Sequence, residues 1–265
     1  MLKLDRITEA NQKYWNSQVN GGNIYTRPWL DLPAAMVRAF AAGEIDVLPE
    51  PYAYIYPQHL FRDVAGKDVL CLASGGGQQS AVFGLLGARV TVFDLTEGQL
   101  EGDRRAAAQH GYQVTTVQGD MRDLSVFVPG SFDIVFQEIS ICFVPDVRPV
   151  YREVARVLGP GGLYRIAHLS SATQCALDTS WDGVGYRIAC PYRGGEIEDV
   201  DDSSREFRHL LSDTFNGLVE AGLAIQGVWE DPRHLHHDCN AMPGSYEHYL
   251  TYVAAYFAIV ARKPP

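Results

Sequence analysis

Long apolar runs are missing from this sequence of 265 residues. No stretch reaches the roughly 20 apolar residues that a membrane-spanning helix needs. The start of the chain, Met1 to Ala10, mixes charged and apolar side chains, unlike a secretory signal peptide. We therefore expect a cytoplasmic protein that does not have a membrane as a partner.

Basic residues are also scarce. The chain has 22 Lys and Arg against 32 Asp and Glu, a net charge of −10, and its Lys and Arg residues form no cluster. Such a field repels nucleic-acid phosphates and anionic lipid surfaces. The composition therefore disfavours nucleic acid and anionic membranes as partners, and it leaves a homodimer open.

Cysteine pairs are absent as well. The five cysteines are far apart, follow no CxxC or zinc-ribbon spacing, and cannot all pair internally because their number is odd. We expect reduced thiols and no metal site among them. They are Cys71, Cys142, Cys175, Cys190 and Cys239.

Short apolar runs alternate with amphipathic stretches from Lys67 to Ala167, which is typical of strands and crossover helices around a parallel sheet. The predicted strands are Asp68–Ala73, Arg89–Phe93, Gln113–Val117, Phe132–Gln137 and Leu163–His168. The predicted helices between them are Gln78–Leu86, Glu97–His110 and Val147–Leu158, and Gly159-Pro160 ends the last one.

The remaining segments complete the predicted architecture. Residues 1–66 carry several prolines and many aromatics, which indicates a helical extension or cap, and residues 67–265 form the main domain with an inserted hairpin and substrate cap at 170–203. A helix at Arg205–Ala221 and strands at Leu223–Glu230 and Tyr246–Arg262 follow. We expect an α/β, Rossmann-like sheet of seven strands, mostly parallel with an antiparallel last strand, and helices on both faces.

Three glycines follow the first predicted strand and precede a helix, at Gly75-Gly76-Gly77. Such a turn lets backbone approach a ligand and directs a helix N-terminus toward it. Asp94 closes the second strand, where a carboxylate can accept hydrogen bonds from both hydroxyls of a ribose. Asp120 and Met121 close the third strand, and two acids at successive strand ends indicate a nucleoside.

The stretch from Asp68 to Lys263 resembles the class I S-adenosylmethionine-dependent methyltransferases of the small-molecule, type 11-like kind. The resemblance lies in Val69–Gly77, Asp94-Leu95, Asp120-Met121, Phe132–Phe136 and Arg156–Leu163. It implies that Gly75 and Gly77 pass under the methionine part of S-adenosylmethionine. It also implies that Asp94 binds the ribose, Leu95 packs on the adenine, and Asp120 with Met121 reads the adenine amino edge.

Two departures from the family pattern lie in the first motif. Cys71 stands where these enzymes often carry an acid, and Ala73-Ser74 replaces a glycine-containing pair. The glycine turn itself is kept. The candidate cofactor-binding residues are Ala73, Ser74, Gly75, Gly77, Gln78, Asp94, Leu95, Asp120, Met121, Gln137, Tyr14 and Tyr25.

The methyl acceptor should bind outside the carboxyl ends of the strands. Glu138 and His168 lie there and are the candidate catalytic residues, although a structural hydrogen bond or a buried imidazole accounts for each equally well. The candidate substrate-binding residues are Trp29, Trp181, Tyr186, His236 and His237. The last two belong to a His-rich loop, 234–239, whose spacing fits no common zinc pattern, so we expect no metal there.

The predicted function is transfer of a methyl group from S-adenosylmethionine to an O, N or S atom of a small molecule. One alternative is an NAD(P)-dependent oxidoreductase on a similar glycine turn. Another is a protein that binds S-adenosylmethionine without catalysis. A third, thiol-based metal or arsenic chemistry, needs Cys142, Cys175, Cys190 and Cys239 to converge in space.

Overall fold

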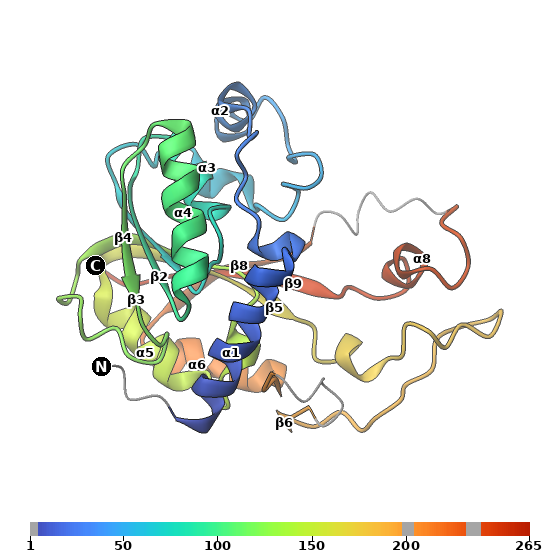
Figure 1. The fold of residues 1–265 in the computed structure, drawn as a ribbon. Coiled ribbons are helices and arrows are strands. Elements are labelled where there is room, and N and C mark those ends of the chain that lie inside the picture. Colours follow the sequence, from blue (N-terminus) through green and yellow to red (C-terminus); the bar gives the residue numbers. More distant parts are fainter. Residues whose placement is uncertain (1–4, 198–203, 232–239) are drawn as a thin grey trace.

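A seven-stranded sheet organises the chain, which a computed structural model describes for residues 5–197, 204–231 and 240–265 (Figure 1). The strand order is β3-β2-β1-β4-β5-β9-β8, with β9 antiparallel to both of its neighbours and parallel pairing from β3 through β5. The strands are β1 (Asp68–Leu72), β2 (Arg89–Asp94), β3 (Val114–Gln118), β4 (Phe132–Gln137), β5 (Leu158–Leu169), β8 (Ala224–Glu230) and β9 (Tyr256–Arg262). The predicted fold class is confirmed.

Helices cover both faces of the sheet (Figure 1). One face carries α2 (Ala34–Ala42), α3 (Gln79–Leu85) and α4 (Glu97–His110), and the other carries α5 (Arg148–Val157) and α6 (Leu211–Glu220). Alternating side chains of β1 enter separate cores: Val69 and Cys71 pack with α3 residues, and Leu70 and Leu72 pack with α5 residues. Burial on both faces explains why these strands are apolar throughout.

The helix α1 (Arg6–Gly21) crosses the carboxyl end of the parallel strands. Asp5 caps its start, with a side chain that accepts a hydrogen bond from Thr8 N, and Gly22 caps its end in a left-handed conformation. Gln12 Nε2 donates to Leu95 O, just after β2, over 2.9 Å. The N-terminal extension therefore reaches the edge of the sheet where ligands of α/β proteins bind.

Short elements complete the described chain. They are the 3₁₀ turns η1 (Ile24–Thr26), η2 (Gln58–Phe61), η3 (Ile141–Phe143) and η4 (Thr173–Cys175), the helix α8 (Tyr246–Leu250), and the antiparallel pair β6 (Gly195–Glu196) and β7 (Phe207–Arg208). Within the described ranges, every helix is too short or too polar to cross a membrane.

Three predicted elements are wrong in part. The strand predicted at Leu163–His168 begins at Leu158, so it includes Gly159-Pro160. The predicted helix Arg205–Ala221 begins only at Leu211, because Phe207–Arg208 pairs with β6. The predicted strand Tyr246–Arg262 starts with α8, which Ser245 caps by accepting a hydrogen bond from His248 N. Apolar and aromatic runs of this length suit either element, so the pairing partner decides.

A buried arginine of β5 fastens the extension to the sheet. The side chain of Arg165 has no exposed surface and donates to the carbonyl oxygens of Tyr56, Gln137 and Tyr54, over 2.9, 3.2 and 3.3 Å. It also forms an ion pair of 2.7 Å with Glu138. Because a guanidinium stays charged inside a protein, these contacts are needed to offset its desolvation.

We expect Arg165→Met to lower the free energy of unfolding by about 3–5 kcal/mol, because it leaves the Glu138 carboxylate and three carbonyl groups without their buried partner. Urea titration measures this change. Arg89→Met is the matched control, since Arg89 also lies on a strand but is 63% exposed in its ion pair with Asp68, and its loss should cost less than about 1 kcal/mol. Equal effects of the two variants would contradict this role of Arg165.

Candidate functional site

The glycine turn between β1 and α3 lies tightly against α4. Gly76 and Gly77 have left-handed φ values of 82° and 84°, which glycine adopts without strain. A Cβ atom on Gly75 would lie 2.1 Å from Gln99 Nε2, and one on Gly77 would lie 2.4 Å from Gly102 O. The turn thus needs glycine for packing as well as for backbone conformation.

A buried acid of α4 lies beneath this turn. Asp103 accepts a hydrogen bond of 2.5 Å from Ser80 Oγ, and burial holds the pKa of the Asp103 carboxyl well above its usual range. Cys71 is fully buried in β1, and burial together with the nearby Asp103 raises the pKa of its thiol. The position that resembles the family's acid is therefore a core position here, and the acid near the turn comes from α4.

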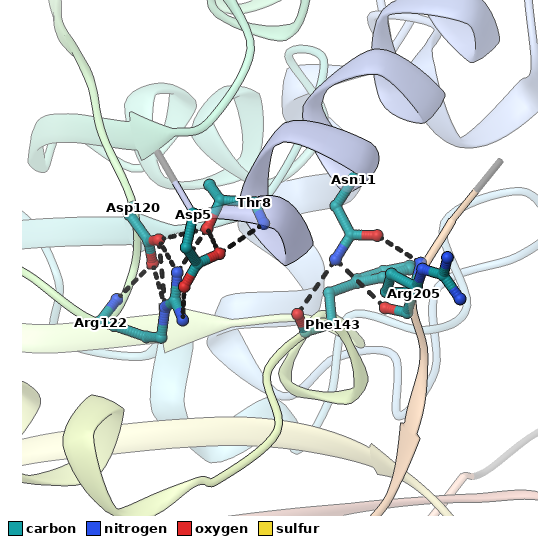
Figure 2. Close-up of polar contacts among 7 residues, drawn as sticks. All are labelled: Asp5, Thr8, Asn11, Asp120, Arg122, Phe143 and Arg205. Atoms are coloured by element: carbon teal, nitrogen blue, oxygen red, sulfur yellow. Dashed lines mark hydrogen bonds and ion pairs between the residues drawn. The ribbon is translucent and has the colours of Figure 1, made fainter. Parts of the chain in front are cut away.

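Two carboxylates stand at successive strand ends, as predicted. Asp94 Oδ1 accepts hydrogen bonds from Thr96 N and Thr96 Oγ1, over 2.9 and 3.0 Å, and burial raises the pKa of Asp94 to about 6. Asp120 is held differently, as Figure 2 shows: Arg122 donates to both of its oxygens, and Thr8 Oγ1 donates to Oδ2 over 2.9 Å.

The helix α1 joins the two halves of the site (Figure 2). At one end, Asp5 forms an ion pair of 2.9 Å with Arg122. Further along the helix, Asn11 Nδ2 donates to the carbonyl oxygens of Phe143 and Arg205, each over 3.1 Å, and Asn11 Oδ1 accepts from Arg205 N over 2.6 Å. One helix therefore contacts β3's end, η3 and the residues before β7.

A cavity of about 890 Å³ lies between α1 and the strand ends. Its size is that of a pocket for a small ligand or cofactor, roughly 300–1,000 Å³. Of the residues singled out from sequence, it is lined by Ala73, Gly75, Gln78, Asp94, Leu95, Asp120, Met121, Tyr14, Tyr25 and Glu138. Residues from distant parts of the chain thus meet at one cavity.

Three of the predicted cofactor residues do not line this cavity. Ser74 is buried at the turn, and Gly77 faces α4. Gln137 is fully buried, donates to Ser140 Oγ over 2.8 Å and accepts from Tyr164 OH over 2.5 Å. These three residues support the turn and the end of β4 and do not line the cavity, so their cofactor contact stays a prediction.

His168 also needs correction. Its imidazole is buried, stacks on Phe257 with ring centroids 5.3 Å apart, and lies 3.3 Å from Tyr151 OH. Burial lowers its pKa to about 3, and the side chain does not line the large cavity. A buried imidazole of this basicity does not suit the general base predicted for this position.

The predicted aromatic substrate residues lie elsewhere. Trp29 is part of the core and packs edge-to-face on Tyr52. Trp181 and Tyr186 pack on each other and on His248, outside the lining of the cavity. The aromatic character of these three residues is accounted for by packing. His236 and His237 lie outside the described residues.

Thiols and metal ligands do not gather in the described part of the chain, where no group of three or more His, Cys, Asp or Glu residues could hold a metal ion. Cys175 lies close to Cys190, whose sulfur accepts from Arg208 over 3.4 Å. Cys142 lines the cavity, and burial raises the pKa of its thiol far above the usual range. Cys239 lies outside the described residues.

Several lining residues were missed from sequence. Gln79 and Gln99 line the cavity, and the Oε1 atom of each is buried with no hydrogen-bond partner among the described residues. Such acceptors suit a ligand that brings N–H or O–H donors. The position of Gln79 just after the glycine turn was a signal available from sequence, and Gln99 of α4 had none. Thr8, Asn11 and Glu206 also line the cavity, and no local pattern marks them.

Fold and site together define a Rossmann-like protein that binds a nucleoside-containing ligand at a glycine turn. A family model described as a methyltransferase domain matches residues 70–166. The uncharacterised methyltransferase YbaJ of Bacillus subtilis is 33% identical over 241 residues, which cover 86% of this chain and 92% of that relative. The chain belongs to the class I S-adenosylmethionine-dependent methyltransferases.

Solved structures agree on the fold. An S-adenosylmethionine-dependent methyltransferase from Mesorhizobium loti has a TM-score of 0.62 at 22% identity, over 88% of this chain and 99% of that one. The 1,6-didemethyltoxoflavin-N1-methyltransferase of Burkholderia thailandensis, with bound 1,6-didemethyltoxoflavin and S-adenosylhomocysteine, has a TM-score of 0.60 at 16% identity, over 100% and 93%. The cofactor is S-adenosylmethionine, and the nicotinamide and non-catalytic alternatives are set aside.

Replacing Asp94 by asparagine should stabilise the fold and weaken cofactor binding. Because its pKa rises from 3.8 to about 6 on folding, the folded state disfavours the ionised carboxylate, and stability is lost as the pH rises toward and through about 6. Asp94→Asn keeps an oxygen for Thr96 and should raise the free energy of unfolding by up to about 3 kcal/mol near pH 8, and by less than about 1 kcal/mol near pH 4.

The same variant should bind S-adenosylmethionine at least about tenfold more weakly near pH 8, because an amide oxygen accepts from a ribose diol less strongly than a carboxylate does. Urea titration and calorimetry measure the two effects. Asp133→Asn is the control, because Asp133 lies at the amino ends of the strands, where it accepts from Asp68 N. This variant should leave the affinity for S-adenosylmethionine unchanged. Unaltered affinity in Asp94→Asn would remove Asp94 from the binding site.

Proposed function

We propose that this chain transfers the methyl group of S-adenosylmethionine to an oxygen, nitrogen or sulfur atom of a small molecule bound in the same cavity. The observation that carries the proposal is the continuity of that cavity, which extends from Gly75 and Asp94 to Glu138 and Glu206 beneath α1. A volume of about 890 Å³ shared with a nucleoside cofactor suits a small acceptor rather than a polymer.

The cofactor would occupy the part of the cavity nearest the glycine turn. Asp94 is placed to accept from the ribose hydroxyls, and Leu95 and Met121 are apolar neighbours for the adenine. The buried oxygens of Gln79 and Gln99 would accept from the methionyl amino group next to Gly75.

Asp120 would act as one part of a network at the adenine end. Its carboxylate already accepts from Arg122 and Thr8, which supports its orientation (Figure 2). Any contact with the adenine amino group would be shared with those donors. The network ties the adenine end of the cavity to α1.

Bound S-adenosylmethionine supplies an electrophilic methyl carbon with sulfur as the leaving group. The chain's own contribution is to hold the acceptor atom in line with that carbon and to exclude water. Tyr14, Trp15 and Phe143 form a contiguous aromatic wall of the cavity, with ring centroids 5.6 and 5.5 Å apart. Glu138, fixed by Arg165, would accept a hydrogen bond from the acceptor group and orient it.

The cytoplasmic location, the division at residue 67 and the homodimer stay predictions. Analytical ultracentrifugation of the purified chain would measure its oligomeric state.

Glu138→Gln should lower kcat about ten- to a hundredfold, because the lost charge weakens a hydrogen bond that positions the acceptor. The Kd for S-adenosylmethionine should stay within about twofold, since Glu138 lies apart from the nucleoside contacts. A screen with methyl-labelled S-adenosylmethionine and small acceptors identifies a substrate, and steady-state kinetics then compare the variants.

Glu101→Gln is the control, because Glu101 is exposed on α4 in an ion pair with Arg104, and its kcat should not change. The Glu138 role fails if the variant retains full kcat. The proposed function itself fails if the wild-type chain binds S-adenosylmethionine but methylates only macromolecules.

A further inference from the structure

Acidic side chains dominate the lining of the cavity. Among the described residues, the ionisable lining groups other than tyrosine and cysteine are the carboxylates of Glu50, Asp94, Asp120, Glu138, Glu206 and Glu247 and the guanidinium of Arg122. Arg122 is paired with Asp120 and Asp5. The field inside the cavity is therefore negative, and it acts on any acceptor that enters.

The cofactor accounts for part of this acidity only. S-adenosylmethionine carries a sulfonium, an ammonium and a carboxylate, a net charge of about +1. Asp94 and Asp120 stand at its nucleoside end, and Glu138 is paired with the buried Arg165. Of the three carboxylates that remain, those of Glu50 and Glu247 are exposed, whereas Glu206 is partly buried. Burial raises the pKa of Glu206, and no ion pair with its carboxylate occurs within the described ranges.

Rigid contacts hold Glu206 at the cavity. Its backbone oxygen accepts a hydrogen bond of 2.9 Å from Ile197 N, next to the β6–β7 pair. The preceding residue, Arg205, exchanges two backbone hydrogen bonds with the Asn11 side chain, which also holds Phe143 O (Figure 2). Arg205 directs its own charge to Glu196, at 3.0 Å, and not to the cavity.

Aromatic rings line the same cavity. Tyr14 and Trp15 belong to α1, as Asn11 does, and Trp15 packs edge-to-face on Phe143 of η3. All three rings line the cavity together with Glu206. Ring faces and a partly buried carboxylate are the two groups that proteins use to bind organic cations.

We propose that the methyl acceptor is a positively charged small molecule, an alkyl or arylalkyl amine that is protonated in water, and that Glu206 is the specificity-determining residue that binds its ammonium group. This inference rests on the proposed function and adds the substrate class. An acceptor with a carboxylate or phosphate group would meet uncompensated like charge in a partly buried site and is disfavoured.

Three probes of one shape test this assignment: phenethylamine, phenethyl alcohol and phenylacetate, which carry a positive, a neutral and a negative group. Calorimetry would measure their binding to the full chain saturated with S-adenosylhomocysteine. We expect phenethylamine to bind at least about tenfold more tightly than phenylacetate, with the alcohol between them, because a hydrogen bond to a charged partner contributes about ten- to a hundredfold in affinity.

Glu206→Gln should lower the affinity for phenethylamine at least about tenfold and leave that for phenethyl alcohol within about twofold. Glu9→Gln is the matched control, because it changes the net charge equally from an exposed position on α1. Binding of S-adenosylhomocysteine should be equal in all three proteins, which separates loss of acceptor recognition from loss of folding.

Weak binding of phenethylamine, equal affinities of the three probes, or an unchanged amine affinity in Glu206→Gln would each overturn the inference. None of these outcomes touches the proposed function as long as methyl transfer to some small molecule is found. Failure of the wild-type chain to bind S-adenosylhomocysteine at all would contradict the proposed function as well.

Discussion

The contact between α4 and the glycine turn is the constraint on which the site depends. A Cβ atom on Gly102 would lie 2.7 Å from Gly76 O, and one on Gly77 would lie 2.4 Å from Gly102 O, so each backbone excludes a side chain on the other. The same approach brings Asp103 to Ser80 at the start of α3 and Gln99 to Gly75. A helix that also packs on the sheet thus sets the position of the turn, and through it the floor of the cavity.

The side of the cavity opposite the glycine turn depends on α1. Its contacts reach the end of β3 through Thr8, the segment after β2 through Gln12, and η3 with the residues before β7 through Asn11. None of these segments is near α1 in sequence, so the cavity exists only once the sheet has formed and the extension has packed against it. Arg165 contributes the second attachment, at Tyr54 and Tyr56. Loop closure over such separations costs entropy, which the buried charge-assisted hydrogen bonds offset.

Sequence reasoning was accurate where a residue's role follows from its place on a strand. Apolar runs with glycine-marked ends predicted the sheet, and Asp94 and Asp120 were placed at the cavity because parallel strands end at one edge. It failed where the role depends on distant neighbours. His168 was a candidate base by residue type, yet Phe257 of β9 and Tyr151 of α5 enclose it. Glu206 was missed for the same reason, since only the fold brings it beside α1.

Two glutamates of the cavity show how burial and partners divide one chemical group into different roles. Glu138 has a fixed guanidinium at 2.7 Å, so its charge is compensated before any ligand arrives and its orientation is set by Arg165. Glu206 is partly buried without such a partner among the described residues, and burial raises its pKa because holding its charge there costs free energy. A cation bound beside Glu206 would recover that cost as affinity, whereas one beside Glu138 would compete with Arg165. Acceptor charge should therefore be recognised at Glu206, and acceptor orientation should be set at Glu138.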